Sequence, residues 1–358
     1  MKHLFSLPVI ALVSAGFFLA PFTCNAQTRT HVVRLAPGHV ALLLDSTDAA
    51  KSITTDRHDR FFEIVTASEM SIQMKQPLAA GQTRENLLPA YINFLKGDVE
   101  GFTAQDVEFT EKVLKKMFKT VGDVNASIFP DTLVMIKTKG THYGAGVWYT
   151  RDNCIVVPKN ELEGRKTNNF TSTMYHELFH VYSRLNPAKR EKLYQLIGFQ
   201  KIGLNNLRLP PSLAERVLFN PDGVDFGQKI TLKTESANGG TIEAIPIIYA
   251  NNVGAKAGQS EFFGYLRFDL FQILPNDDGS WRVVTKDDGF SSTLKMDELP
   301  DFFRQIKDNT GYIIHPDEVL ADNFSFIMAE KSNPQYTAKF SAEGKKLLKD
   351  VEAILIQK

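Results

Sequence analysis

The sequence predicts an α+β protein, because the periodicities of helices and of strands occupy different stretches of the chain. Apolar residues recur at helical spacing through residues 84–95 and 103–118, whereas residues 132–138 and 144–158 are rich in the β-branched and aromatic residues typical of strands. Helical periodicity returns at residues 299–306, 316–331 and 341–356. The chain has 358 residues, of which 43% are hydrophobic, so it can bury a large core.

These patterns divide the chain into four parts. Residues 27–125 are predicted to be mostly helical, and residues 126–199 and 296–358 together to form a core in which a mixed sheet packs on a helix. Residues 200–295 are expected to form a β-rich insertion, because frequent Pro, Gly and Asn separate candidate strands at residues 230–233, 241–250, 262–274 and 281–285. The remaining part, residues 1–26, has the pattern of a targeting segment.

Residues 1–26 are interpreted as a cleaved secretory signal peptide. Lys2 precedes an apolar stretch over residues 4–19, and Cys24-Asn25-Ala26 offers small residues at positions −3 and −1 before Gln27. A retained membrane anchor and lipidation of Cys24 are the less favoured alternatives. The mature protein is therefore expected to be secreted or periplasmic. No later segment reaches 18 consecutive apolar residues, so no stable membrane span is expected in the mature chain.

The charge balance argues against a nucleic-acid partner. Lys plus Arg equals Asp plus Glu at 41 each, and losing Lys2 with the signal peptide leaves 40 basic against 41 acidic side chains. Loss of Cys24 would leave Cys154 as the single cysteine, which excludes an internal disulfide. Because Cys154 lies in an apolar strand-like run, we interpret it as a buried structural thiol.

The strongest functional signal lies on a helix predicted over about residues 168–184 and reads His176-Glu177-Leu178-Phe179-His180. Two histidines four residues apart share one helix face, so both can bind the same Zn²⁺ ion. Glu177 is placed to accept a proton from a metal-bound water and is the predicted general base. Apart from Glu177, the flanking turns carry no charge, which indicates a buried helix. The alternative is a pair of core histidines with a glutamate partner.

This motif resembles the active-site helix of the zincin metallopeptidases. The metzincin branch is disfavoured because Ser183 and Asn186 stand where its pattern requires Gly and then His or Asp. The gluzincin branch, which includes thermolysin-like enzymes, takes its third ligand from a Glu-x-x-x-Asp pattern on a later helix. Residues 316–324 match that pattern, so the resemblance implies Glu318 as the third metal ligand and Asp322 as the residue that orients a ligand histidine. The alternative for Glu318 is an acid facing the helix dipole.

The resemblance departs from the family in the gap between the two motifs. His180 and Glu318 are 138 residues apart (318 minus 180), far more than in thermolysin-like enzymes, so residues 200–295 are expected to be an insertion into a zincin-like core. The resemblance also implies an oxyanion-stabilising Tyr or His. Because it precedes Glu318 by three residues, His315 is favoured for this role over Tyr249, Tyr265 and Tyr312.

The resemblance implies zinc-dependent hydrolysis of peptide bonds in a peptide or protein substrate, with an edge strand near residues 144–149 pairing with the substrate backbone. Two other functions remain open. One is a zinc amidase or esterase on the same fold. The other is a non-catalytic envelope binding module with a structural or vestigial zinc site. The role of residues 27–125 as a pro-segment or as a permanent scaffold also remains open.

Overall fold

The protein has an α+β fold, as the sequence predicts, in which two mixed sheets flank a central helix. The computed structural model describes residues 29–203, 206–219, 222, 225–234, 239–259 and 261–357. The predicted signal peptide at residues 1–26, including Cys24, lies outside the described residues. Among the residues that are described, no helix combines the length and apolarity needed to cross a membrane.

The first sheet, sheet A, contains strands from the N-terminal region and from the segment before the motif helix. Its order is β1 (His31–Ala36), β2 (His39–Leu43), β4 (Thr132–Thr138), β6 (Cys154–Pro158) and β5 (Tyr149–Arg151), with β3 (Val99–Glu100) paired to β4. Strands β2, β4 and β6 run parallel, whereas β1, β3 and β5 pair antiparallel with their neighbours. Since β2 pairs directly with β4, the N-terminal region is an integral part of this sheet.

The second sheet, sheet B, is built from residues 199–283. Its order is β7 (Phe199–Lys201), β9 (Gln228–Thr234), β10 (Gly240–Ala250), β11 (Leu266–Pro275), β12 (Trp281–Val283) and β8 (Leu207–Arg208). All of its pairs are antiparallel except β12 with β8. The candidate strand at residues 262–274 begins later than predicted, because Phe262–Gly264 form a 3₁₀ turn before β11.

The helices cover both faces of sheet A and also pack against sheet B. They are α1 (Ser46–Ser52), α2 (Phe61–Ile64), α3 (Ala67–Met74), α4 (Arg84–Asp98), α5 (Ala104–Asn125), α6 (Lys159–Gly164), α7 (Thr167–Leu185), α8 (Pro187–Gln195), α9 (Pro211–Ala214), α10 (Pro300–Ile306), α11 (Pro316–Ser332) and α12 (Ala342–Leu355). At the start of α5, Thr103 and Asp106 form a capping box, as predicted.

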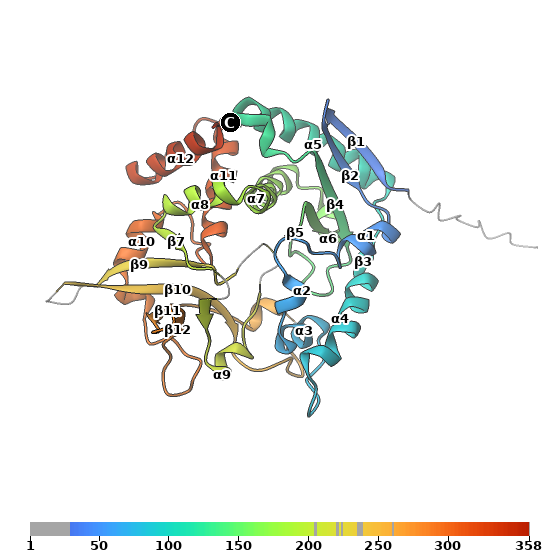
Figure 1. Ribbon diagram of the computed structural model, residues 1–358. Coiled ribbons are helices and arrows are strands. Elements are labelled where there is room, and N and C mark those ends of the chain that lie inside the picture. The colour runs from blue at the N-terminus through green and yellow to red at the C-terminus, as the bar shows by residue number, and fades with distance from the viewer. Residues whose placement is uncertain are drawn as a thin grey trace, which may run out of the picture.

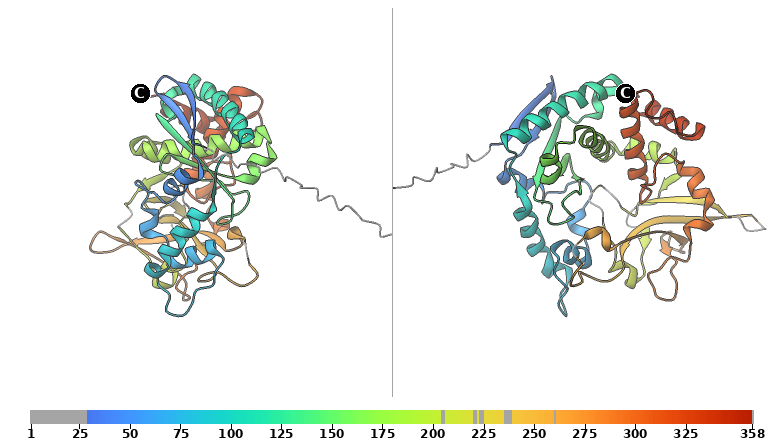
Figure 2. Two further views of the ribbon diagram at one scale, coloured as in Figure 1. Left: turned by 90° about the vertical axis from the view of Figure 1, so that its right-hand side faces the viewer. Right: turned by 180° about the vertical axis from the view of Figure 1, so that it is seen from behind.

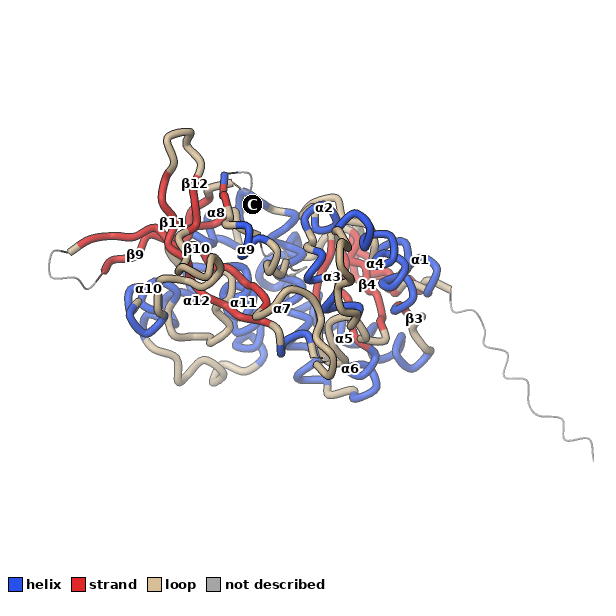
Figure 3. Tube along the Cα trace, turned by 90° about the horizontal axis from the view of Figure 1, so that it is seen from below, coloured by secondary structure: helices blue, strands red, loops and turns tan. Residues whose placement is uncertain are grey.

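Alternation along β4 divides the core into two layers, because successive side chains of a strand point to opposite faces. Leu133 and Met135 pack with α5, α7 and α11, whereas Val134 and Ile136 pack with α1–α4. One face of sheet B joins the first layer through residues of β9 and β10. Helix α7 consequently lies between the two sheets, seen end-on near the centre of Figure 1 and from behind in Figure 2. Figure 3 shows sheets A and B on opposite sides of α7 and α11.

Candidate metal centre

Helices α7 and α11 pack side by side and bring the two sequence motifs together. The two helices approach closely at a pair of small residues: Ser325 of α11 donates a hydrogen bond to the Ser172 carbonyl (3.1 Å), and the two hydroxyls lie 3.0 Å apart. Helix α11 begins with His315 as N-cap and Pro316 in its first turn, where Asp317 and Glu318 face the positive end of the helix dipole.

Three side-chain atoms converge at one point between these helices. His176 Nε2 lies 3.0 Å from Glu318 Oε2, and His180 Nε2 lies 3.3 Å from the same oxygen. All three atoms lie within 4.8 Å of one another. Ligands of a tetrahedral zinc ion at 2.0–2.2 Å are separated by about 3.3–3.5 Å, so this set needs little rearrangement to hold the ion.

Two aspartates hold the imidazoles in the orientation that a metal site requires. His176 Nδ1 donates to Asp322 (2.9 Å), the residue that the resemblance implies as its orienting partner, and His180 Nδ1 donates to Asp317 (2.6 Å). Because an ionised carboxylate only accepts hydrogen bonds, each contact places a proton on Nδ1 and turns Nε2 towards Glu318.

Asp317 is a site residue that the sequence analysis missed. It is buried, and its second oxygen accepts hydrogen bonds from Ser183 (2.5 Å) and from the Tyr194 hydroxyl (2.7 Å). Its place directly before Glu318 was visible in the sequence, but two adjacent helical residues point in different directions. Only the packing of α11 on α7 shows that both reach the same histidine pair.

The site concentrates negative charge around the two imidazoles. Burial acts to lower the pKa of His176, but hydrogen bonds to Asp322 and Glu318 outweigh it and raise this pKa to about 10. Burial acts to raise the pKa of Glu318, but the charge of His180 and the hydrogen bond from His176 hold it well below its usual range. Without a metal, this arrangement stabilises positive charge on the imidazoles, and a divalent cation would satisfy the same carboxylates.

Glu177 lies beside the three converging atoms and is not one of them. Its side chain lines a cleft of about 460 Å³, and its Oε2 has no hydrogen-bond partner among the described residues. Burial and the neighbouring charge of Asp222 raise the pKa of Glu177 to about 8. His180 Nε2 likewise lacks an aligned hydrogen bond within the described part of the chain. Buried polar atoms without hydrogen-bond partners destabilise the folded state. A bound metal ion and a water on it would provide partners for both atoms.

Asp222 is a second residue that the sequence analysis missed. Its carboxylate lies within 4.8 Å of the nearest ligand-type atoms of Glu177 and His180. It accepts hydrogen bonds from the backbone N–H (2.5 Å) and the hydroxyl (3.0 Å) of Thr150 on β5. Asp222 therefore attaches the sheet edge to the wall of the cleft. No periodic pattern marks this residue in the sequence.

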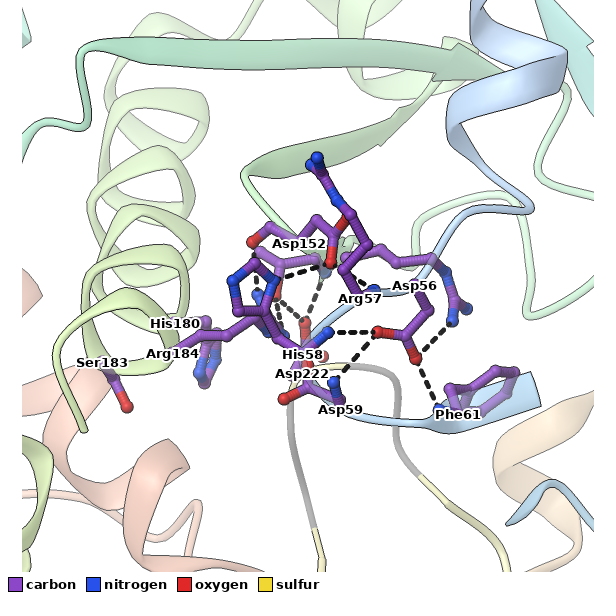
Figure 4. Close-up of polar contacts among 12 residues, drawn as sticks. Asp56, Arg57, His58, Asp59, Phe61, Asp152, His180, Ser183, Arg184 and Asp222 are labelled. Carbon is purple, nitrogen blue, oxygen red and sulfur yellow. Dashed lines mark hydrogen bonds and ion pairs between the residues drawn. The ribbon is translucent and has the colours of Figure 1, made fainter. Parts of the chain in front are cut away.

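The helix that carries the histidines is anchored one turn further on by Arg184, which is buried. Arg184 donates to Asp59, to the Asp152 carbonyl (3.0 Å) and to the Thr150 hydroxyl (3.0 Å). Figure 4 shows this cluster, in which Asp152 also binds Arg57 (2.8 Å) and His58 (2.9 Å) of the N-terminal region. The N-terminal region thus contacts the site helix directly, through the ion pair of the partly exposed Asp59 with the buried Arg184.

The structure places the four oxyanion candidates differently. Tyr312 lines the cleft, and its ring stacks on that of His176 with centroids 5.9 Å apart. The favoured residue, His315, lies outside the cleft lining. Its ring is buried behind the site, where Nδ1 accepts from the Asp317 N–H (3.1 Å) to cap α11. Tyr249 and Tyr265 also lie outside this cleft and bond to Asp269 and to backbone groups near residue 256.

Other sequence expectations concern residues near the cleft. His31, His39, His58 and His142 have hydrogen-bond partners elsewhere and do not belong to the convergent set. Cys154 is a buried free thiol whose pKa burial raises to about 12. Residues 144–148 do not form the edge strand that was expected there, because a Val147–Gly144 turn bond occupies this segment and β5 begins only at Tyr149.

Two imidazoles and one carboxylate form a donor set that suits zinc in a catalytic site and also suits non-haem iron. Glu177 beside the set, in place of a fourth protein ligand, favours a site with an open position for water. Comparison of the chain with protein-family models, with curated proteins and with solved structures finds no match. The interpretation of the site therefore depends on its own geometry.

Substitution of Glu318 should abolish stoichiometric metal binding. Glu318→Ala removes one of three ligands and leaves the buried imidazoles without their shared oxygen, so most bound zinc should be lost in metal analysis after dialysis. Glu161→Ala is the matched control, because Glu161 lines the same cleft outside the convergent set. If both variants retained equal zinc, Glu318 would be excluded as a ligand.

Proposed function

We propose that this protein is a zinc-dependent hydrolase that cleaves peptide bonds, with a site of the gluzincin type. The observation that carries the proposal is the convergence of His176 Nε2, His180 Nε2 and Glu318 Oε2, with Glu177 beside them. His176, Glu177 and Glu318 line the cleft, and His180 is buried next to them. Both imidazoles have a carboxylate on Nδ1, the arrangement that fixes ligand histidines in metalloenzymes. The expected signal peptide places the proposed activity outside the cytoplasm.

The proposed roles follow from where each side chain lies. A zinc ion held by His176, His180 and Glu318 would supply a Lewis acid that polarises the substrate carbonyl and acidifies water. Glu177 accepts the proton of the attacking water at its partner-free Oε2 and passes it to the leaving amine. Asp317 and Asp322 keep the two imidazole rings oriented towards the metal during the reaction. A structural zinc site would have no use for a base in the position of Glu177.

Tyr312 is our candidate for stabilising the negative charge that develops on the substrate carbonyl oxygen. Its side chain lies on the cleft wall against His176, and it is partly exposed, so its hydroxyl can reach a bound substrate. This assignment replaces His315, which is fully buried and caps α11. A phenol that donates a hydrogen bond only to the developing oxyanion stabilises the transition state more than it strengthens substrate binding.

The shape of the cleft supports a peptide as substrate. One wall is the segment Gly146, Val147 and Trp148, which leads into the antiparallel edge strand β5. Helix α7 adds neutral polar groups to the lining, among them Asn169 and Thr173. Edge strands and amide-bearing walls suit an extended backbone, which offers its own donors and acceptors.

Replacement of Glu177 should separate metal binding from catalysis. Glu177→Gln keeps the shape of the side chain and removes the base, so zinc content should be unchanged while turnover of a fluorogenic peptide mixture falls by about 10²–10⁴-fold. Glu161→Gln, the same change elsewhere in the cleft, should keep near wild-type turnover. Loss of zinc from Glu177→Gln, or full activity, would contradict its role as the base. Cleavage of esters or simple amides alone by the wild type would favour an esterase or amidase.

Removal of the Tyr312 hydroxyl should lower the rate of the chemical step. For Tyr312→Phe we expect kcat to fall by about 10²–10³-fold with little change in KM, since the ring and its stacking on His176 are retained. Tyr336→Phe is the control, because Tyr336 is exposed and outside this cleft. A rise in KM at constant kcat would assign Tyr312 to substrate binding instead.

A further inference from the structure

A small apolar cavity adjoins the cleft next to the metal centre. Its volume is about 60 Å³, and the residues that line both it and the cleft are Val147, Trp148, Asp222, Phe263 and Tyr312. The cavity and the cleft thus share a wall within reach of a substrate held at His176. Its deeper lining comes from sheet B and its approach segment, including Leu218, Ile248 of β10 and Leu266 of β11.

The lining indicates an apolar occupant. Most of the cavity surface is contributed by aliphatic and aromatic groups. The polar residues of the lining are Asp222, which accepts hydrogen bonds from Thr150, and three tyrosines, two of which use their hydroxyls elsewhere. Tyr143 contacts Glu69 (3.4 Å), and Tyr149 contacts His142 Nε2 (2.9 Å), so their ring faces and edges remain to line the space. Away from Asp222, the lining offers a polar side chain little to replace its lost hydration.

The size of the cavity limits the occupant further. A cavity of about 150 Å³ holds benzene, with six carbon atoms, so by proportion a cavity of this size holds about two to three carbon atoms. That volume fits side chains from alanine to valine in size. An aromatic ring would enter only if the lining rearranged.

We propose that this cavity binds the side chain of the substrate residue that flanks the hydrolysed bond, and that it selects small aliphatic residues, valine foremost. The inference rests on the proposed function for the identity of the substrate as a peptide. It assigns substrate selection to sheet B, whose residues separate the two metal-binding motifs in the sequence. Sheet B then supplies the specificity of a site whose reactive groups come from α7 and α11.

The test uses peptides that differ only at the residue on one side of the cleaved bond, with Gly, Ala, Val, Leu or Phe there, and a second set varied on the other side. In one of the two peptide sets, kcat/KM of the wild type should be at least about tenfold higher for the Val peptide than for the Gly peptide. In that set, kcat/KM for the Phe peptide should be lower than for the Val peptide by a similar factor. Ile248→Phe fills the cavity and should bring Val and Gly within about twofold of each other. Ile248→Ala enlarges it and should move the preference towards Leu or Phe.

Ile247→Ala is the matched control. Ile247 precedes Ile248 on the same strand, is equally buried and packs in the other cluster of sheet B, away from the cavity. It should keep the preference for Val. If Ile248→Phe does not fold, Ile248→Ala carries the test, because thermal unfolding of Ile247→Ala calibrates the loss of stability from truncation alone.

Calorimetric titration of the same peptides into zinc-loaded Glu177→Gln separates the two proposals. A preference for Val in Kd without hydrolysis by the wild type would support the cavity and overturn the hydrolase. Hydrolysis without that preference, or with Phe preferred by the wild type, would overturn the cavity and leave the hydrolase standing. Neither binding nor hydrolysis of any peptide would overturn both.

Discussion

The structure of the site depends on the burial of two α11 carboxylates, Asp317 and Glu318, against the imidazoles of α7. Each is at most 2% exposed, and an ionised carboxylate in such a setting is unstable without hydrogen bonds and a compensating charge. His176 and His180 provide the hydrogen bonds and the compensating positive charge. The imidazoles of α7 and the carboxylates of α11 therefore offset the cost of each other's burial. Removal of either partner leaves an uncompensated buried charge. A metal cation bound between the helices would also compensate the charge of these carboxylates.

The rest of the fold holds these two helices in register. Arg184, one turn beyond His180, ties α7 to β5 and to the segment around Asp59, while sheet A receives three of its strands, β1, β2 and β3, from the N-terminal region. Sheet B, together with α8 and α10, fills the 138 residues between the motifs (318 minus 180) and returns the chain so that α11 can pack on α7. The elements between the two motifs therefore bring residues that are distant in sequence close together in space.

Local spacing explains what the sequence could predict about the site. Positions four apart on a helix share a face in any tertiary context, so the pairing of His176 with His180 and of Glu318 with Asp322 was accessible. Asp317 and Asp222 were not, because their roles depend on how α11 and the edge of sheet A meet α7. His315 was favoured for its nearness to Glu318 in sequence, but the helix start turns its ring inward to the Asp317 N–H, and Tyr312 faces the cleft instead.

Zinc K-edge X-ray absorption on the purified mature chain tests the central claim most directly. The account predicts one tightly held zinc ion with four light-atom ligands at about 2.0–2.2 Å, two of them showing the outer-shell scattering of imidazole. Cys154, the only described cysteine, is buried outside the convergent set, so no sulfur ligand is expected. A chain that retains no zinc, or holds it in six-coordinate or sulfur-containing geometry, would contradict the account.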